Sequence, residues 1–292
     1  MIKTTDTSEK ALQKLIVKYL VEEQGYAESI SNDFDREFCI NKVQLMAFLE
    51  KTQLDTYNYI QQKGERSFLV RLDRRIQDKG IIEVLRKGLS FNDKRIMFFY
   101  PEPNSSYNFK DKAKYDANIF SVTEELIYTD LHKNRLDLTI FLNGLPIITS
   151  ELKNAFTYQA VQNAIKQYMY DRNPKDKIFN LGRCMVHFAV DTTQVFMAGS
   201  LAHKNTAFFP FNKGQNEGKP FAPFGAGNPI NPSGQKTAYL WEEVLSKSSL
   251  SNIIQKFATL ITETNSETGK KKRIQIFPRY HQLTGVREIL AD

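Results

Sequence analysis

The chain has 292 residues, of which 41% are hydrophobic and 25% are charged, a composition that is ordinary for a folded globular protein. It has no apolar run of about 18 residues and no apolar signal core, so we expect a cytoplasmic protein without a membrane segment. The net charge of +7 permits binding to phosphate backbones but is weak support for it. Cys39 and Cys184 lack the spacing of a metal site and are expected to be buried thiols.

A helix is predicted near the N-terminus, over residues 6–21. Its apolar positions fall on one helical face, which contains Leu12, Leu15, Ile16, Tyr19 and Leu20. Asp6 and Glu9 fit a capping box at its first turn, and Gly25 is placed to end it. Capping of its own helix is therefore the simplest role for Glu9, although its carboxylate could instead bind a metal.

Helical and strand-like segments follow one another through the middle of the chain. Residues 31–90 are predicted to be mainly helical, residues 95–100 a strand and residues 110–118 a helix. Three strand-like runs lie within residues 119–153. The dipeptide Asn143–Gly144 separates the last two runs and is the strongest hairpin signal in the chain.

The remainder of the chain contains fewer clear signals. A helix over residues 158–170 precedes two strands, CMVHFAVD and QVFMAGSL. Residues 212–236 are rich in Gly, Pro and Asn, which predicts a long loop. A helix-like stretch covers residues 239–260. The basic run Lys270–Arg273 is most simply a solvated turn, although it could touch DNA phosphates.

The predicted hairpin brings candidate catalytic residues together. Alternate side chains of a strand share a face, so Glu151 and Lys153 point the same way. A three-residue loop, Asn143–Leu145, sets Asp137 directly opposite Glu151, whereas a two-residue turn would place the two carboxylates on opposite faces. The three-residue register also leaves a nearly clean apolar face, made of Leu136, Leu138 and Ile140 opposite Leu152, Ser150 and Ile148. We therefore predict the three-residue loop, against the usual interpretation of Asn-Gly.

Two facing carboxylates repel each other, and a bound cation would compensate for the repulsion. A hard cation such as Mg²⁺, or Mn²⁺, takes oxygen ligands, which Asp137, Glu151 and the backbone carbonyl of Leu152 could supply. Lys153 could orient or deprotonate the attacking water, which makes this a coherent site for phosphodiester hydrolysis. Because an Asp followed by Glu-x-Lys is common by chance, a half-exposed sheet with solvated charges is the alternative interpretation.

Other patterns do not indicate a further cofactor site. The histidines are scattered at His132, His187, His203 and His281, so zinc is not expected. The glycines near residues 214–220 lack the spacing of a Walker A motif. Gln159, Gln162 and Lys166 form a polar helical stripe, for which solvent exposure is the default.

From about residue 8 to its end, the chain resembles the restriction (R) subunit of type I restriction-modification enzymes. The stretches that carry the resemblance are NDFDREFCI, LDLTIFLNGLPIITSELKN, AIKQYMYDRNP, MVHFAVDTTQVFMAG, TAYLWEEVL and FPRYHQLTGVR. The resemblance implies an α/β fold with a restriction-endonuclease-like PD-(D/E)xK core, which is a mixed central sheet flanked by helices, and a helical insertion. It implies an endonuclease domain over residues 1–245, followed over residues 246–292 by a linker and the beginning of the ATPase/helicase domain. Within the endonuclease domain, the expected parts are the first helix (1–30), the helical insertion (31–95), the catalytic core (96–205) and the loop (212–236).

The same resemblance implies roles for individual residues. Asp137, Glu151 and Lys153 match the family's catalytic residues, and Glu9 matches the acidic residue of its first helix. Tyr168 is similar to the tyrosine of the family's Gln-x-x-x-Tyr element, but the residue four positions earlier is Ala164. Three nearby glutamines could fill the missing position, namely Gln159, Gln162 and Gln167.

The activity implied is that of a type I site-specific deoxyribonuclease, a DNA-binding hydrolase that cleaves double-stranded DNA with Mg²⁺ and defends against foreign DNA. In the full enzyme this cleavage is coupled to ATP-driven translocation. Gln282 resembles the adenine-contacting glutamine of a Q-motif, but the other ATPase motifs are absent, so ATP binding is expected only of the full-length subunit. The implied partners are DNA and the methylation and specificity subunits. Two alternatives are a stand-alone repair nuclease with the same core and a non-catalytic module that docks subunits.

Overall fold

The computed structural model describes residues 9–105, 107–154, 160–214, 227–232, 234–264 and 269–291. Within these residues, a seven-stranded mixed sheet forms the centre, in the order β1-β6-β7-β8-β9-β10-β11. The strands are β1 (Ala27–Ser29), β6 (Phe120–Ile127), β7 (Arg135–Leu142), β8 (Leu145–Leu152), β9 (Val186–Val190), β10 (Val195–Ala198) and β11 (Phe209–Pro210). Neighbouring strands are parallel at β1–β6 and β8–β9 and antiparallel elsewhere. The predicted α/β fold, with a mixed central sheet flanked by helices, is confirmed and is consistent with a restriction-endonuclease-like fold.

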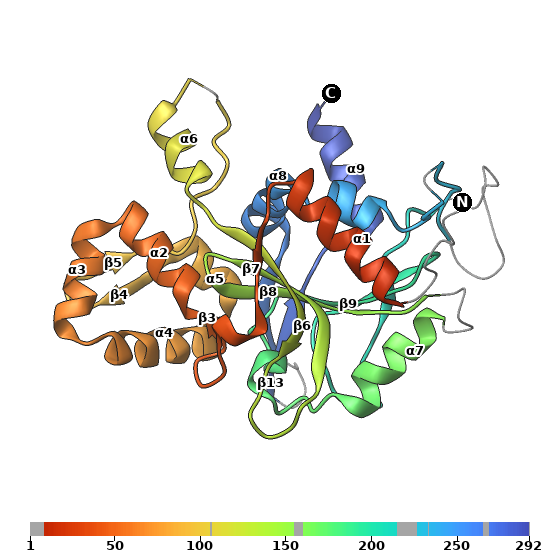
Figure 1. Ribbon diagram of the computed structural model, residues 1–292, viewed down its shortest axis with the longest axis horizontal. Helices are drawn as coiled ribbons and strands as arrows, with labels where there is room; N and C mark the ends of the chain where they lie inside the picture. The colour runs from red at the N-terminus through yellow and green to blue at the C-terminus, as the bar shows by residue number, and fades with distance from the viewer. Residues whose placement is uncertain are drawn as a thin grey trace, which may run out of the picture.

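Helices cover both faces of the sheet (Figure 1). The first face packs against α1 (Glu9–Glu22) and the π-helical turn η5 (Leu240–Val244), in a core that includes Leu138, Ile140 and Ile148. The second face packs against α7 (Val161–Lys166) and the π-helical turn η3 (Gln167–Asp171), in a separate core that includes Phe141 and Tyr168. This alternation along β7 follows from the two-residue period of a strand.

The predicted helical insertion is present as α2 (Lys42–Thr52), α3 (Leu54–Lys63), α4 (Glu65–Lys79) and α5 (Ile81–Lys87). It does not extend to residue 31, because residues 31–41 form the short helix η1 (Ser31–Asp33) and the strands β2 (Phe34–Asp35) and β3 (Ile40–Asn41). A hairpin of β4 (Leu89–Phe91) and β5 (Lys94–Ile96) closes it. The strand predicted over residues 95–100 therefore ends at Ile96. The Gln53 side chain is hydrogen-bonded to both the N–H and the C=O of Met97, so neither group is available for pairing with another strand.

The predicted first helix is present, but its buried face differs from the prediction and its predicted capping box lies outside the described residues. Leu15 is 41% exposed, whereas Gln13 and Val17 are buried. The buried stripe therefore runs along Leu12, Ile16 and Leu20 and widens toward Gln13 and Val17 rather than toward Leu15. This rotation arises because α1 packs on β6 and β8 with η5 beside it. Gly25 has a φ of 65° and follows the last turn, as predicted. Asp6 and the side chain of Glu9 lie outside the described part, so the capping box stays a prediction.

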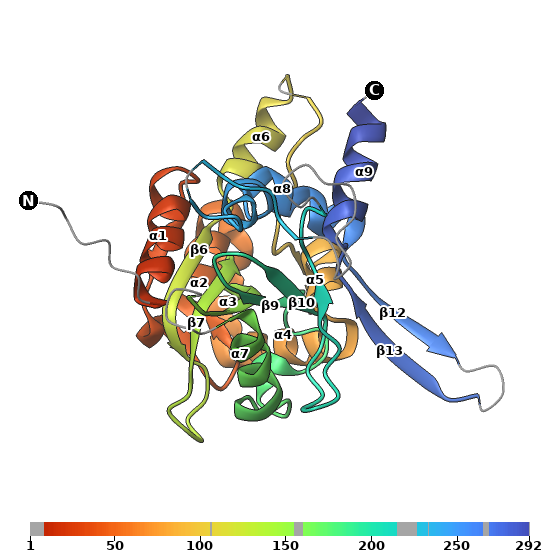
Figure 2. The same ribbon diagram turned by 90° about the vertical axis from the view of Figure 1, so that its right-hand side faces the viewer.

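The C-terminal part contains a hairpin that the sequence did not indicate. The helix-like stretch forms η5, α8 (Lys247–Asn252) and the π-helical turn η6 (Ile253–Phe257), after which β12 (Thr259–Thr264) pairs with β13 (Lys271–Ile276). The basic run Lys270–Arg273 is thus mostly strand, and its prediction as a turn is wrong. Figure 2 shows this hairpin projecting from the body. Because most of the hairpin lies outside the core, no buried face marks it in the sequence.

After β13 the chain returns to the core at Phe277, and the first turn of α9 (Tyr280–Ala291) packs on it through Tyr280 and Leu283. Leu250, Ile253 and Phe277 belong to the same apolar core as the sheet. The division at residue 245 therefore coincides with no break in packing, and it stays a prediction. Of the predicted loop at 212–236, residues 215–226 and 233 lie outside the described part.

Three smaller predictions can also be compared with the structure. The helix predicted at 110–118 is α6 (Phe109–Asp116). Cys39 and Cys184 are buried free thiols, as predicted. None of the helices described has both the length and the apolar character needed to cross a membrane.

Candidate active site

The turn between β7 and β8 sets the geometry of the candidate site. Leu142 pairs with Leu145, so Asn143 and Gly144 form a two-residue turn, with φ values of 51° and 80°. The predicted three-residue loop is therefore wrong, and the usual interpretation of Asn-Gly holds. Glycine is required at position 144 by more than its φ, because an added Cβ would overlap the Asn41 carbonyl oxygen.

A β-bulge then restores the register that the sequence predicted. The ladder shifts by one residue at Ile147, and the pairs on its two sides are Phe141–Pro146 and Ile140–Ile148. Beyond the bulge Thr139 pairs with Thr149, as predicted, and the same register brings Asp137 to the level of Glu151. An extra residue inside the strand has the same effect on register as an extra residue in the loop.

The backbone ladders on both sides of β7 are interrupted at Asp137. On one side pairing with β8 stops at Leu138, and the Asp137 Oδ2 accepts a hydrogen bond from the Leu152 N–H at 2.6 Å. On the other side the ladder with β6 skips Glu125, whose φ is 51°. This distortion turns Leu136 into the core beneath α7, so the prediction that it shares a face with Leu138 is wrong.

Glu151 is the most deeply buried carboxylate of the candidate site, with 0% of its surface exposed. Its Oε1 accepts a hydrogen bond from Arg172 Nε at 2.6 Å, whereas its Oε2 is buried and has no hydrogen-bond partner among the described residues. Burial and the nearby Asp137 raise the pKa of Glu151 to about 8, against the opposing effect of Arg172. The charged form of Glu151 is therefore disfavoured by burial despite its bond to Arg172.

Lys153 lies one residue beyond β8 and is also buried. Its Nζ donates to the Leu152 carbonyl at 2.9 Å, and its backbone N–H donates to Val190 at 2.8 Å. Asp137 and Lys153 thus bind the N–H and the C=O of the same residue, Leu152. The structure brings the three predicted catalytic side chains together around this residue.

Arg172 was missed by the sequence analysis, although it makes the strongest contact to Glu151. Its guanidinium is buried, and its Nη2 also donates to the Arg135 carbonyl at 2.7 Å. Arg172 follows η3 in an extended conformation, so its direction depends on that π-helical turn. No spacing rule gives the position of a π-helical turn, and none could have identified Arg172.

A comparison with protein families identifies the chain. The model described as type I restriction enzyme R protein N terminus matches residues 6–206, which is more than half of the chain and includes β7, β8 and α7. The chain belongs to this family. Membership in the R-protein N-terminal family indicates the nuclease part of a restriction system. Comparison with curated protein sequences gives no match.

The family match contains a second layer of side chains behind the site. The Tyr168 hydroxyl is hydrogen-bonded to Thr149 Oγ1 at 2.9 Å, and the same oxygen is hydrogen-bonded to His187 Nδ1 at 2.7 Å. Burial lowers the pKa of His187 to about 3, so its ring is neutral at physiological pH. Tyr168 therefore supports β8 from behind through Thr149.

The other candidate residues of the sequence analysis are more dispersed. On α7 and η3, Gln162 is exposed and Gln167 is half-buried, whereas Gln159 lies outside the described residues. Gln282 lies beyond the span of the family match, on α9. Its Oε1 accepts from the Arg279 N–H at 3.0 Å, which places it in the first turn of α9.

The donor set at the site fits a hard divalent cation better than a transition metal. Among the residues that the structure describes, no three His, Cys, Asp or Glu side chains form a cluster. Two carboxylates and a carbonyl, completed by water, are the kind of set that Mg²⁺ takes. The buried Oε2 of Glu151 supports this fit, since it has no other partner.

Proposed function

We propose that this chain is the Mg²⁺-dependent endonuclease domain of a type I restriction-modification R subunit and that it cleaves double-stranded DNA. The observation that carries the proposal is the pair of buried carboxylates, Asp137 and Glu151, where the β7–β8 ladder ends. A purely structural sheet has no reason to bury two carboxylates at one level, because each loses hydration and the two repel each other.

Asp137, Glu151 and the Leu152 carbonyl would hold the cation, which would be Mg²⁺ or, with the same ligands, Mn²⁺. When bound, the cation would neutralise charge on the scissile phosphate and lower the pKa of a bound water. The protein prepares these ligands in advance. Asp137 is fixed by the Leu152 N–H, and Glu151 is fixed by Arg172, which is itself anchored to the Arg135 carbonyl.

Lys153 supplies the positive charge that faces the phosphate. Its ammonium now donates to the Leu152 carbonyl, the group that would become a ligand. In the proposed role, this ammonium group would orient a water molecule or a phosphate oxygen at the cation. A lysine in this role does not need to lose its proton to hold the nucleophile in line.

The second layer keeps β8 in place during the reaction. Tyr168 and His187 both bind the Thr149 hydroxyl, two residues before Glu151 on the same strand face. Tyr168 is thus a positioning residue. Gln159, Gln162 and Gln167 stay candidates for the missing glutamine of the Gln-x-x-x-Tyr element.

In the complete enzyme, we propose that cleavage follows ATP-driven translocation in the cytoplasm. DNA specificity would come from a separate specificity subunit, and the methylation subunits would protect host DNA. Gln282 would contact adenine only once the rest of the ATPase domain is present, and a metal role for Glu9 would require α1 to reach the cation.

The test is a full-length R subunit that carries Asp137→Ala or Lys153→Ala, reassembled with methylation and specificity subunits. We expect about a hundredfold or greater loss of DNA cleavage, with ATP hydrolysis and translocation unchanged. Asp55→Ala and Lys51→Ala, at exposed positions on α3 and α2, are matched controls that should cleave normally. Cleavage that persists in both variants alongside normal translocation would favour a non-catalytic docking module, and cleavage by the isolated chain without ATP would favour a stand-alone nuclease.

A further inference from the structure

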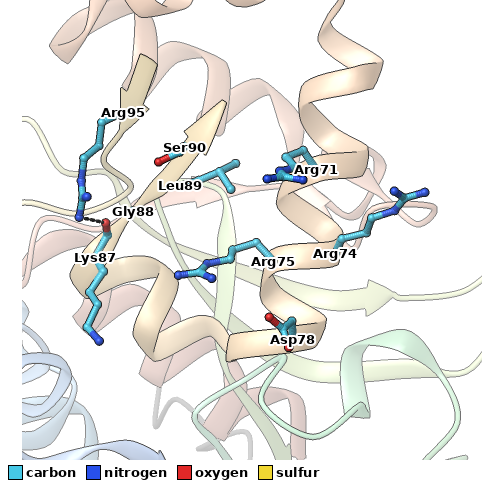
Figure 3. Close-up of a pocket in the computed structure, with 9 residues that line it drawn as sticks. All are labelled: Arg71, Arg74, Arg75, Asp78, Lys87, Gly88, Leu89, Ser90 and Arg95. Atoms are coloured by element: carbon cyan, nitrogen blue, oxygen red, sulfur yellow. Dashed lines mark hydrogen bonds between the residues drawn. The ribbon is translucent and has the colours of Figure 1, made fainter. Parts of the chain in front are cut away.

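A basic cavity lies in the helical insertion, between α4, the end of α5 and the β4–β5 hairpin (Figure 3). Its volume is about 450 Å³. Five cationic side chains line it, namely Arg71, Arg74, Arg75, Lys87 and Arg95. Such a concentration of one sign of charge in a concave site attracts anions.

The arginines of α4 lie on one helical face, at positions i, i+3 and i+4. Like charges at these spacings repel each other and destabilise a helix slightly. In Figure 3 the guanidinium groups of Arg71 and Arg75 reach from α4 toward the β4–β5 hairpin, and Arg95 extends from the hairpin toward Gly88. Arg74 and Lys87 point outward at the rim.

The protein's own carboxylates compensate for only part of this charge. Glu83 pairs with Arg75 at 3.1 Å and lies 3.7 Å from Lys87, while Asp78 pairs with Lys79 at 3.5 Å. Arg95 donates to the Lys87 carbonyl rather than to a carboxylate. Within the described part of the chain, Arg71 and Arg74 have no ion pair or hydrogen bond. The cavity therefore keeps a surplus of positive charge with free donors.

The donor chemistry fits a phosphate better than a nucleobase. Guanidinium groups match the oxygens of phosphate in a bidentate manner, and the exposed hydroxyl of Ser90 adds a further donor at the wall. None of the described residues that line the cavity is aromatic, so they offer no surface on which a base could stack. The backbone of a nucleic acid fits these properties better than a nucleotide does.

The surroundings indicate a polymer rather than a free phosphate ion. Arg273 of β13 donates to the Gln77 carbonyl at 3.0 Å, one residue before Asp78 at the end of α4. The basic strand β13, with Lys271 and Lys272 exposed, therefore adjoins the helix that lines the cavity. Positive charge continues beyond the cavity, as an extended polyanion requires.

We propose that this cavity binds a backbone phosphate of duplex DNA, at a place separate from the cleavage site. The proposal rests on the proposed function, because the duplex is the polymer that the site at Asp137 would cut. It adds an anchoring contact that fixes the path of DNA over the helical insertion without reading its sequence.

The test is fluorescence anisotropy of a labelled duplex of about 30 base pairs with the full chain in EDTA, between about 50 and 200 mM salt. For Arg71→Gln/Arg74→Gln we expect the Kd to rise roughly tenfold and the slope of log Kd against log salt to fall by about 1, as the loss of one neutralised phosphate requires. Arg71→Lys/Arg74→Lys keeps the charge and should recover most of the slope but less of the affinity. Lys51→Gln/Lys63→Gln, at exposed positions on α2 and α3, removes the same charge elsewhere and should change the Kd less than about twofold.

Three results would overturn the proposal. They are an unchanged Kd and slope for Arg71→Gln/Arg74→Gln, an equal loss in the Lys51→Gln/Lys63→Gln control, and binding of inorganic phosphate or ATP at the arginines without any binding of duplex. If Arg71→Gln/Arg74→Gln loses duplex binding while the Asp137→Ala enzyme still cleaves, the phosphate site is supported and the proposed function is rejected. If Arg71→Gln/Arg74→Gln binds normally while the Asp137→Ala enzyme no longer cleaves, only the phosphate site is rejected.

Discussion

The Glu151→Gln substitution is expected to stabilise the fold in metal-free buffer while it abolishes cleavage. The folded state raises the pKa of this buried carboxyl from 4.5 to about 8, so at pH 7 folding must take up a proton. At about 1.4 kcal/mol for each pH unit above 4.5, this uptake lowers the free energy of unfolding by about 3 kcal/mol. Glutamine resembles the protonated carboxyl, keeps a hydrogen-bond acceptor for Arg172 and avoids that loss. The net expected gain is about 3 kcal/mol.

The sign of this effect gives it a characteristic pH dependence. A carboxyl whose pKa is raised by folding lowers stability progressively as the pH rises from 4.5 to about 8. The advantage of Glu151→Gln should therefore shrink by about 1.4 kcal/mol for each unit that the pH is lowered from 7. Adding Mg²⁺ should also reduce the advantage, because the cation binds only the folded wild-type site.

Urea unfolding in EDTA, followed by fluorescence of the single tryptophan, Trp241, measures these differences. Trp241 is buried in the core, so its emission reports global unfolding. Glu50→Gln, at an exposed position on α2, is the matched control and should leave stability unchanged at every pH. A Glu151→Gln variant that is no more stable than the wild type, or a difference that does not vary with pH, would refute the claim that burial raises the pKa of Glu151.

Three further predictions concern the turn, the second layer and the missed arginine. Gly144→Ala should lower the free energy of unfolding in urea by more than about 3 kcal/mol, because the added Cβ meets backbone atoms. Gly234→Ala, at a similar φ but in open space, should lower it by about 1 kcal/mol. Equal losses would contradict the close approach at the turn. The pKa of His187 is near 3 in the fold and its ordinary 6.5 when unfolded, so His187 destabilises the fold as the pH falls. The His187→Asn variant should therefore lose about 2 kcal/mol less stability than the wild type between pH 8 and 5. Parallel pH profiles of the two proteins would argue against a neutral buried ring. Arg172→Lys should lower cleavage at least about tenfold and the free energy of unfolding by about 2 kcal/mol, because lysine cannot bridge Glu151 and the Arg135 carbonyl. A fully active variant would show that Arg172 has no role in the site.

The register of the hairpin shows how far the sequence could go. The alternation of polar and apolar residues required a register that pairs Thr139 with Thr149, and it predicted this pairing correctly. The local Asn-Gly signal required a two-residue turn, and it was also correct. The two requirements differ by one residue, and the structure reconciles them with a bulge at Ile147. Nothing in the apolar run LPIITSEL marks where a bulge will occur, so the loop length was predicted incorrectly.

The other errors have a common physical cause, which is that tertiary contacts override local pattern. Leu15 lies on the predicted apolar face, but the helix rotates toward Gln13 and Val17 to suit its neighbours. Met97 would continue a strand if its backbone groups were not taken by Gln53. Arg172 reaches Glu151 only because a π-helical turn redirects the chain. Each outcome depends on residues that are distant in sequence, which a local pattern cannot contain.

Isothermal titration of the metal-free chain with Mg²⁺ and with Mn²⁺, at pH 7, tests the central claim that Asp137 and Glu151 together hold a cation. The account predicts one binding event in the wild type and in Asp55→Asn, an exposed control on α3, and no detectable binding in Asp137→Asn. A binding isotherm of Asp137→Asn that is unchanged from the wild type would contradict the account, because the cation would then not be held between the two buried carboxylates.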